Sequence, residues 1–288
     1  MPRIDWKDTI IPKVNELLGS YGFRPTLRQV FYRLVAALLI PNTETTYKSL
    51  SRATVLAREQ EIIEPMAFED RMRGYEGGDE GWETGQGYVD ALLQGLSEAP
   101  ERYVRPMWTS QQSRPIIWLE KDALMTPVTQ IADRFRVRTY AARGYSSFSA
   151  VYEAAQEIYG GVHVLQLTDF DPSGEDMVRD LRDRLTRYGA QDFDVTKIAL
   201  SSSQVASLGL PPMPAKRADP RYDAFAASYG DEVVELDALP PDELERIIAQ
   251  AIEDLIDPDF WDPAQAREEE EREEAQRLIE EILRKLRE

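Results

Sequence analysis

The sequence predicts an α/β fold with a mainly parallel sheet, preceded by an all-helical module. Two observations carry this prediction. From residue 115 onward, short apolar runs alternate with amphipathic stretches, which is the order typical of βαβ units. Before that point, apolar residues recur at helical spacing and are interrupted by Gly, Pro and Asn. We therefore expect four parts: a helical module (1–75), a linker (76–114), an α/β domain (115–260) and an acidic helical tail (261–288).

Composition limits the chemistry that this chain can perform. Its 288 residues include no cysteine and one histidine, His163. Disulfides, thiolate sites and multi-histidine zinc sites are therefore excluded, and catalysis must rest on carboxylates, hydroxyls, phenols and cations. Apolar runs fall well short of the ~20 residues of a membrane helix, and the N-terminal residues show no apolar signal stretch. We expect a cytoplasmic protein that has no membrane partner.

The distribution of charge matters more than the formal net charge of −18. Residues 1–60 hold nine Lys or Arg and five Asp or Glu, a net charge of +4. Residues 231–288 hold seven Lys or Arg and twenty-one Asp or Glu, a net charge of −14. Because a polyanion docks according to the local field, the basic N-terminal region is a candidate DNA-binding surface. The acidic region is either solvated surface or a means of keeping DNA in one groove.

Three helices are expected in the N-terminal module: Trp6–Leu18, Leu27–Ile40 and Thr45–Glu61. Thr26 is the expected N-cap of the second helix. In the third helix the residues expected to face inward are Leu50, Val55, Leu56 and Ile62, and those expected to face outward are Lys48, Arg52 and Arg58. Three short helices with a tight second turn are typical of a helix-turn-helix or winged-helix module, with a candidate wing strand at Phe68–Arg73. A plain three-helix bundle is the alternative.

The α/β domain is expected to contain four strands: Ile116–Leu119, Val137–Ala141, Val162–Leu167 and Val195–Leu200. Helices are expected between them, over Ala123–Phe135, Phe148–Tyr159 and Gly174–Tyr188. An irregular stretch follows, then a strand-like Val233–Leu236, a helix over Asp242–Ile256 and a helical tail from Pro263. The apolar stripe of the tail, from Leu278 to Leu286, suits either self-association or packing against the body.

Carboxylates follow two of these strands. Glu120 comes directly after the first strand, and Asp169 and Asp171 come directly after the third. Because the carboxyl ends of parallel strands lie along one edge of a sheet, the three side chains are expected to converge. Oxygen ligands without histidine or cysteine favour Mg²⁺ or Mn²⁺. Gly174 then permits a tight turn into a helix whose N-terminus favours phosphate. The alternative is that the aspartates only cap that helix.

A tyrosine in the N-terminal module is a candidate nucleophile. The helix from Leu27 carries an apolar stripe formed by Leu27, Val30, Phe31, Leu34, Val35 and Leu38. Tyr32 lies beside this stripe, and Arg28 lies one turn earlier on the same side. A phenol with a pKa of ~10 needs a nearby cation or metal to attack phosphorus. A packing role, with the hydroxyl in water, is the alternative.

A Glu after a buried strand, followed by an Asp-x-Asp and a Gly after a later strand, resembles the TOPRIM domain of topoisomerases, DnaG-type primases and some nucleases. The resemblance implies one or two Mg²⁺ ions held by Glu120, Asp169 and Asp171. The stretch from Arg143 to Ser147 is also similar to a Gly-Tyr-Pro-Asp motif of the topoisomerase VI A subunit, with Ser146 and Ser147 in place of Pro and Asp.

The run from Thr26 to Tyr32 resembles the Arg-acid-hydrophobic-aromatic-Tyr motif of the topoisomerase VI A subunit and the meiotic double-strand-break transesterase. The resemblance implies that Tyr32 is the nucleophile and Arg28 the accompanying arginine, whereas Gln29 departs from the usual acid. It covers roughly residues 20–200. The chain looks most like the short, stand-alone bacterial and viral relatives called Mini-A, which lack an obvious ATPase partner. The segment Leu236–Pro240 also resembles that group.

The resemblance implies a homodimer that cuts double-stranded DNA with Mg²⁺ or Mn²⁺, acting at the prokaryotic nucleoid or in a virus or plasmid. Tyr32 of one chain would work with the three carboxylates of the other and become linked to a 5′ end. The candidate DNA-contacting residues are Arg33, Lys48, Arg52 and Lys121. Two alternatives stay open: a TOPRIM nuclease in which Tyr32 is structural, and a DNA-binding dimer without activity. The need for ATP or a partner subunit, and religation, also stay open.

Overall fold

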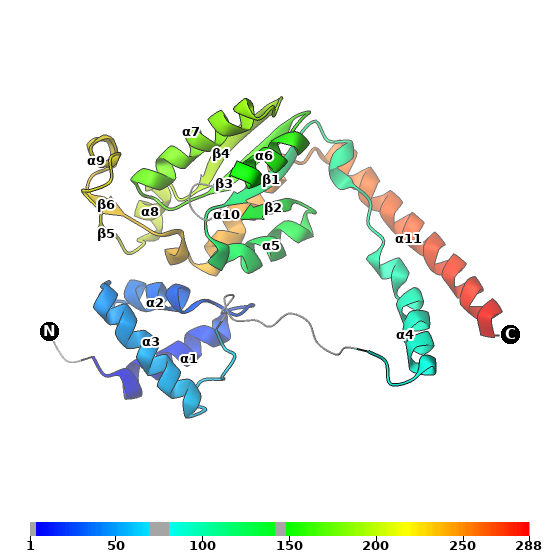
Figure 1. Ribbon diagram of the computed structural model, residues 1–288, viewed down its shortest axis with the longest axis horizontal. Coiled ribbons are helices and arrows are strands. Elements are labelled where there is room, and N and C mark those ends of the chain that lie inside the picture. Colours follow the sequence, from blue (N-terminus) through cyan, green and yellow to red (C-terminus); the bar gives the residue numbers. More distant parts are fainter. Residues whose placement is uncertain (1–3, 69–80, 142–147, 288) are drawn as a thin grey trace. The chain divides into compact units, whose positions relative to one another are not determined.

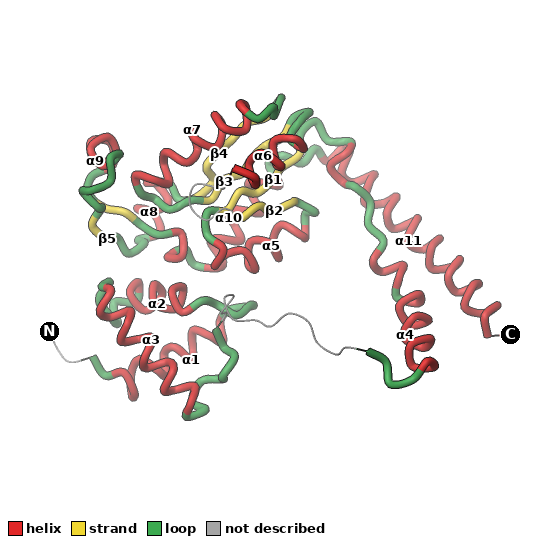
Figure 2. The backbone as a smooth tube through the Cα atoms, in the orientation of Figure 1, coloured by secondary structure: helices red, strands yellow, loops and turns green. Residues whose placement is uncertain are grey.

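The computed structural model describes residues 4–68, 81–141 and 148–287. The chain divides into two compact units. The first contains Met1–Met72 and Pro115–Asp254, and the second contains Arg73–Arg114 and Leu255–Glu288. Figure 1 labels the helices and strands, and Figure 2 separates them from the loops.

The N-terminal module consists of three α-helices after a π-helical turn, η1 (Trp6–Ile10): α1 (Ile11–Ser20), α2 (Leu27–Ala36) and α3 (Glu44–Glu59). The expected helices are therefore present. Helix α2 begins at a complete capping box, in which the Thr26 side chain accepts from the Gln29 N–H and the Gln29 side chain accepts from the Thr26 N–H. Gln29 thus performs a capping role that an acid at the same position would also perform.

Two details of the expected helix faces were wrong. Helix α2 ends at Ala36, so Leu38 leaves the apolar stripe and is 92% exposed at a positive φ of 56°. In α3, Leu50 is buried as expected, but Thr46, Thr54 and Ala57 are its other buried residues. Val55 and Leu56, and Ile62 beyond the helix, are instead exposed. Apart from Leu50, α3 therefore packs through small side chains, whereas Val55 and Leu56 remain in solvent. Of the candidate wing, only Phe68 lies within the described residues.

The four expected strands form one all-parallel sheet in the order β2-β1-β3-β4, which confirms the α/β class. The strands are β1 (Arg114–Leu119), β2 (Arg138–Ala141), β3 (Val162–Leu167) and β4 (Phe193–Ala199). Helices connect them: α5 (Met125–Arg134) after a short turn η4 (Asp122–Leu124), α6 (Phe148–Glu157) and α7 (Pro172–Arg187). Strands β1 and β3 are central, and the ends of both carry predicted site residues.

The sheet is covered on both faces. Alternate residues of β1 and β3, such as Ile116, Trp118, Val162 and Val164, pack against α6 and α7 in one buried cluster. Helices α5 and α10 (Pro241–Glu253) contact each other and the sheet through β2 and β4. Strands buried on both faces are typical of parallel sheets, and this burial explains why β1 is apolar after Arg114 and why β3 is polar only at His163 and Gln166.

The stretch between β4 and α10 is more ordered than the sequence indicated. It contains α8 (Ser202–Leu208), β5 (Met213–Pro214), α9 (Tyr222–Tyr229), β6 (Glu232–Val233) and a 3₁₀ turn, η5 (Leu236–Ala238). Strands β5 and β6 form an antiparallel pair, and Val234 exchanges two backbone hydrogen bonds with Phe170. This pairing brings the segment after β6 alongside the end of β3, and helix η5 also contacts α2.

The second unit contains α4 (Gly85–Ser97), two 3₁₀ turns (η2, Ala99–Arg102; η3, Met107–Thr109) and the long α11 (Pro258–Arg287). The expected linker over 76–114 is thus partly helical and packs on the C-terminal helix. Trp108 meets Trp261 edge to face, and Gln111 exchanges two hydrogen bonds with the backbone of Asp257. In α11, the side chains of Leu278, Ile282 and Leu286 are about half exposed or more. None of the helices in the described ranges has the length and apolarity needed to cross a membrane.

Candidate active site

The structure brings Glu120 and Asp169 together at the ends of β1 and β3. The Glu120 N–H donates to the carbonyl of Leu167 at 3.0 Å, which continues the pairing of the two strands by one residue. The Glu120 carboxylate in turn accepts from the Asp169 N–H at 3.0 Å. Parallel strand ends therefore place these two acids side by side, as their positions in the sequence predict.

Asp169 is nearly buried, with an exposed fraction of 8%. Its Oδ1 accepts from the Leu236 N–H at 2.6 Å and lies 3.0 Å from Lys121 Nζ. Burial, partly offset by Lys121, raises the pKa of Asp169. The residues on either side fix the backbone at Asp169. Thr168 makes backbone hydrogen bonds with Ala199 and Leu200, and Phe170 makes two with Val234.

Asp171 caps helix α7, since its Oδ1 accepts from the Gly174 N–H at 2.6 Å. Asp171 is therefore a helix cap, and because a cap leaves other carboxylate lone pairs free, its role as a metal ligand stays a prediction. Gly174 is required for space: a Cβ at this position would lie 2.1 Å from the carbonyl oxygen of Asp169. Close approach of α7 to the end of β3, and not a special turn, is what the glycine permits.

Lys121 is the central cation of the site and is 17% exposed. Its Nζ lies 3.0 Å from Asp169 Oδ1, 3.0 Å from Glu235 Oε2 and 3.2 Å from Asp237 Oδ2. Burial alone would lower the pKa of this lysine, but the three carboxylates outweigh burial and raise the pKa. Lys121 therefore stays charged and is held inside the site, and its contact with DNA stays a prediction.

Tyr32 and Arg28 reach the same cluster from helix α2. Arg28 donates to Glu235 Oε2 at 2.9 Å, and the Tyr32 hydroxyl is also hydrogen-bonded to Glu235. Tyr32 is 3% exposed, so it is buried and does not lie at the rim of the apolar stripe. Helix α2 also packs against η5, and this contact explains why Tyr32 is buried although it lies outside the apolar stripe. Burial and the charge of Glu235 raise the pKa of Tyr32 well above its ordinary value.

One cavity of about 570 Å³ joins the predicted nucleophile to two of the three predicted metal ligands, whereas Glu120 lines a different cavity. Arg28 and Tyr32 line it from α2, Asp169 and Asp171 line it from the end of β3, and Glu235 lines it from the segment after β6. Its volume lies in the range of ~300–1,000 Å³ typical of ligand sites. The candidate site residues of the two modules therefore meet within one chain.

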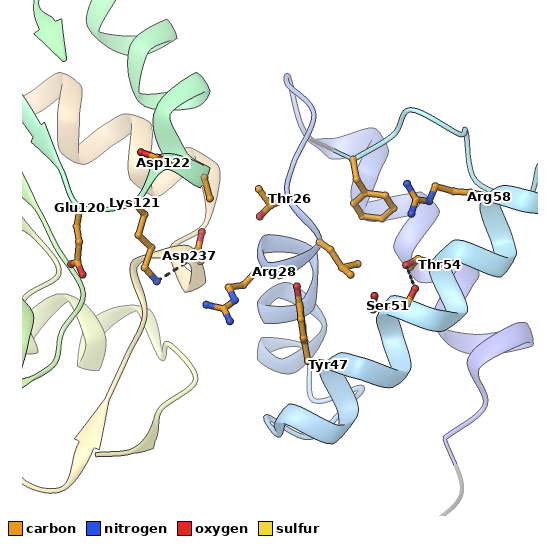
Figure 3. A pocket seen from close by; sticks show the side chains of 13 residues that line it. Thr26, Arg28, Tyr47, Ser51, Thr54, Arg58, Glu120, Lys121, Asp122 and Asp237 are labelled. Atoms are coloured by element: carbon orange, nitrogen blue, oxygen red, sulfur yellow. Dashed lines mark hydrogen bonds and ion pairs between the residues drawn. The ribbon is translucent and has the colours of Figure 1, made fainter. Parts of the chain in front are cut away.

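A second cavity of about 690 Å³ shares Arg28 and Tyr47 with the first. Figure 3 shows Arg28 extending from α2 toward Lys121 and Asp237, which are joined by their ion pair. Hydroxyl groups of Thr26, Ser51 and Thr54 and the guanidinium of Arg58 also line this cavity. Asp237 Oδ1 and Arg58 Nε are buried and lack a hydrogen-bond partner within the described part of the chain.

The charged side chains at this site contact one another or lie close enough to interact electrostatically, and carboxylates outnumber cations among them. The acids are Glu120, Asp169, Asp171, Glu175, Glu235 and Asp237, and the cations are Arg28, Lys121 and Lys197. Burial and the charge of Asp169 accordingly raise the pKa of Glu120 to about 7. A hard cation would relieve this excess of negative oxygen ligands.

The residues fit a divalent metal in their chemistry and in their charge. Within 4–68, 81–141 and 148–287, however, no three acidic, histidine or cysteine side chains are already gathered around one point. The reason is local: Lys121 and the Leu236 N–H hold Asp169, and the N-terminus of α7 holds Asp171. A metal at these acids would therefore compete with Lys121.

The remaining candidate residues are dispersed. Lys48 is largely exposed and pairs with Glu44 one turn away at 2.7 Å, Arg52 is exposed, and Arg33 is half-buried. The stretch from Arg143 to Ser147 lies outside the described residues, so its likeness to the topoisomerase VI A motif stays a prediction.

Sequence reasoning missed Glu235 and Asp237 as site residues. They alternate with Leu236 and Ala238, both fully or nearly buried, directly after β6. Two acids alternating with apolar residues at the end of a strand are the signal that could have revealed them, since such acids are seldom buried without a cation.

Comparison with known proteins gives no relative for this arrangement. Neither the protein-family models nor the curated proteins nor the solved structures contain a match to the chain. The resemblance to the topoisomerase VI A family therefore remains an expectation from the motifs, and the geometry of the site is the basis on which function is inferred.

Proposed function

We propose that this protein cleaves double-stranded DNA by tyrosine transesterification, in the manner of a type IIB topoisomerase A subunit with winged-helix and TOPRIM parts. The observation that carries the proposal is the shared cavity, which unites Tyr32 and Arg28 with Asp169 and Asp171 from more than a hundred residues later.

In this mechanism the Tyr32 oxygen forms a bond to phosphorus and the bond to the 3′ oxygen breaks, which leaves a 5′-phosphotyrosyl end. Arg28 binds the phosphate and offsets its developing charge. Glu120, Asp169 and Asp171 would hold Mg²⁺ or Mn²⁺, which supplies charge stabilisation to the phosphate and the departing oxygen. Because Tyr32 is buried, the phosphate would reach it through the cavity.

Two copies of the chain are part of the proposal, because a double-strand break requires one tyrosine for each strand. The resemblance implies that each tyrosine works with the acids of the partner chain. The structure instead supports an arrangement in which Tyr32 works with Asp169 and Asp171 of its own chain, since both line the same cavity.

A metal-dependent nuclease is the second candidate, and one observation favours it. Tyr32 is buried, hydrogen-bonded to Glu235 and raised in pKa, which are the properties of a structural phenol. In that case the metal site would activate water, and Tyr32 would only position Glu235.

A plasmid assay separates these functions. Supercoiled DNA is incubated with Mg²⁺ or Mn²⁺, stopped with detergent and divided into protease-treated and untreated halves. The wild type is compared with Tyr32→Phe, Asp169→Ala and the control Tyr103→Phe, which removes a tyrosine that donates to Glu271 in the second unit.

We expect protein-linked 5′ ends that disappear in Tyr32→Phe and Asp169→Ala and persist in Tyr103→Phe. Free 5′ phosphates that disappear only in Asp169→Ala would identify the nuclease. The absence of any cleavage by the wild type, with DNA binding retained, would contradict both activities and leave a DNA-binding role. In each case binding should weaken steeply with salt.

A further inference from the structure

Three donors converge on the carboxylate of Glu235. Arg28 Nη1 and Lys121 Nζ both contact its Oε2, at 2.9 and 3.0 Å, and the Tyr32 hydroxyl is hydrogen-bonded to the same side chain. Tyr32 and Glu235 also line the same cavity. The carboxylate of Glu235 is therefore an acceptor within reach of the proposed nucleophile, and the same carboxylate holds two cations.

We propose that Glu235 accepts the hydroxyl proton of Tyr32 during attack, and that an incoming DNA phosphate prepares Glu235 by drawing Arg28 and Lys121 away from its carboxylate. This inference rests on the proposed transesterase function. It assigns to Glu235 a role that neither the strand-end pattern nor the tyrosine motif suggested.

The charges around Glu235 link its role as a proton acceptor to the arrival of a DNA phosphate. Burial disfavours the ionised form of Glu235, but Lys121 and Arg28 outweigh burial and hold its pKa below the ordinary value. Such a carboxylate is a poor base while both cations contact it. A phosphate that takes over the two cations removes the cause of the low pKa, so that basicity appears only when substrate is present.

The other groups that face Glu235 act in the same direction. Asp169 is close enough for the charge of Glu235 to raise its pKa, and Asp237 shares Lys121 with Glu235. Both are negative, so both favour proton uptake by Glu235 once Lys121 moves. In the resting state Lys121 and Arg28 cancel this effect, and Tyr32 remains a neutral phenol.

The step balances without a further reactant. The phenolic oxygen of Tyr32 forms the O–P bond, its proton passes to Glu235, and the P–O3′ bond breaks with its electron pair on the 3′ oxygen. That oxygen takes a proton from water, and Glu235 later returns its own proton to solvent. The products are a 5′-phosphotyrosyl end and a 3′ hydroxyl.

The test measures single-turnover formation of the covalent adduct on a 3′-labelled duplex, with protein in excess, because the 5′-phosphotyrosyl fragment retains the original 3′ end. Glu235→Gln keeps the size of the side chain and removes the base. We expect adduct formation to slow by about 10²–10⁴-fold, as is typical for loss of general-base catalysis, with DNA affinity retained. Rising pH or added imidazole should restore part of the rate in Glu235→Gln but not in Tyr32→Phe.

The matched control is Asp237→Asn, which removes another carboxylate that contacts Lys121, at 3.2 Å from its Nζ. We expect it to slow the reaction far less and to show no rescue by imidazole. Glu235→Asp keeps the charge that Lys121 and Arg28 require, so it tests proton transfer even if Glu235→Gln folds poorly.

The possible outcomes separate a failure of the transesterase function from a failure of the role assigned to Glu235. If the wild type forms no adduct, the transesterase function fails and this proposal fails with it. If the wild type forms the adduct and Glu235→Gln matches its rate, only the role of Glu235 is overturned. Equal, unrescued slowing in Glu235→Gln and Asp237→Asn would also overturn it, because it would show that the carboxylates only hold Lys121.

Discussion

Each unit of this protein contains a tyrosine that donates to a glutamate, which also binds an arginine. In the first unit the three residues are Tyr32, Glu235 and Arg28. In the second they are Tyr103, Glu271 and Arg105, with Tyr103 donating at 2.5 Å and Arg105 at 2.6 Å. The chemical groups are the same, yet their surroundings differ in ways that decide what each set can do.

The set around Glu235 continues into a buried lysine, further acids and a cavity, whereas the set around Glu271 ties the chain before β1 to helix α11. Burial is the largest cause of the raised pKa of Tyr32, whereas the hydrogen bond to Glu271 is the largest cause for Tyr103. A tyrosine, a glutamate and an arginine are thus insufficient to indicate catalysis. The buried Lys121 and the surplus of carboxylates distinguish the candidate active site from a structural contact.

The largest expected difference between the two sets concerns stability. Lys121→Met removes the cation between Asp169, Glu235 and Asp237 and leaves them buried without compensation. Breaking a buried ion pair by removing one partner costs about 3–5 kcal/mol, and we expect a loss of this order. Urea denaturation at pH 8 measures it.

Arg105→Met is the matched change in the second unit. Arg105 and Glu271 are each about 30% exposed, so water replaces the lost partner in part and we expect a much smaller loss. If the two variants lost comparable free energies of unfolding, burial would not make the ion pairs of the first set contribute more to stability than those of the second.

Glu120, which lies beside Lys121 and Asp169 of the candidate site, and Glu271 of the second set should respond to pH in opposite directions. The pKa of Glu120 is raised to about 7, so its contribution to stability is fully present below about pH 4.5 and is lost as the pH rises through 7. The pKa of Glu271 is lowered to about 2 by Tyr103 and Arg105, so its contribution is present above about pH 4.5 and is lost as the pH falls toward 2.

Denaturation between pH 4 and 8 in the presence of EDTA tests this contrast. Glu120→Gln should remove a decline in stability that we estimate to be on the order of 1–3 kcal/mol over this range. Glu271→Gln should leave that decline unchanged and should lower stability by a nearly constant amount across this range, because the contribution of Glu271 is lost only as the pH falls below about 4.5. A wild type whose stability rises steadily from pH 5 to 8 would contradict the raised pKa of Glu120.

The sequence predicted most of the architecture because the relevant signals are local. The βαβ alternation located β1, β3 and α7 within about two residues, and the Thr26 cap located α2. The stretch between β4 and α10 was read as largely irregular, because α8 and α9 are short and owe their order to neighbouring elements. The linker was likewise misjudged, since the residues it contacts in and before α11 lie between 146 and 168 positions later in the chain.

The site was predictable only in part. Strand order brings Glu120 and Asp169 together, and this follows from the rule for parallel sheets. The burial of Tyr32 did not follow from helical periodicity, because η5 covers a second face of α2. Glu235 and Asp237 enter through the antiparallel bridge between Phe170 and Val234, a long-range pairing that no local pattern of residues reveals.

The smallest expected effect concerns the ionisation of the two phenols. Because the hydrogen bond to Glu271 is the first cause of the raised pKa of Tyr103, Glu271→Gln should lower that pKa toward 10. Glu235→Gln should lower the pKa of Tyr32 as well but leave it clearly above 10, because burial, its larger cause, persists. Titration followed by ¹³C NMR of labelled tyrosine Cζ resolves this, with Tyr103→Phe and Tyr32→Phe to assign the two signals among thirteen tyrosines. If Tyr32 also titrated near 10 in Glu235→Gln, the carboxylate and not burial would be the cause of its raised pKa. The phenols of the two sets would then owe their raised pKa to the same interaction.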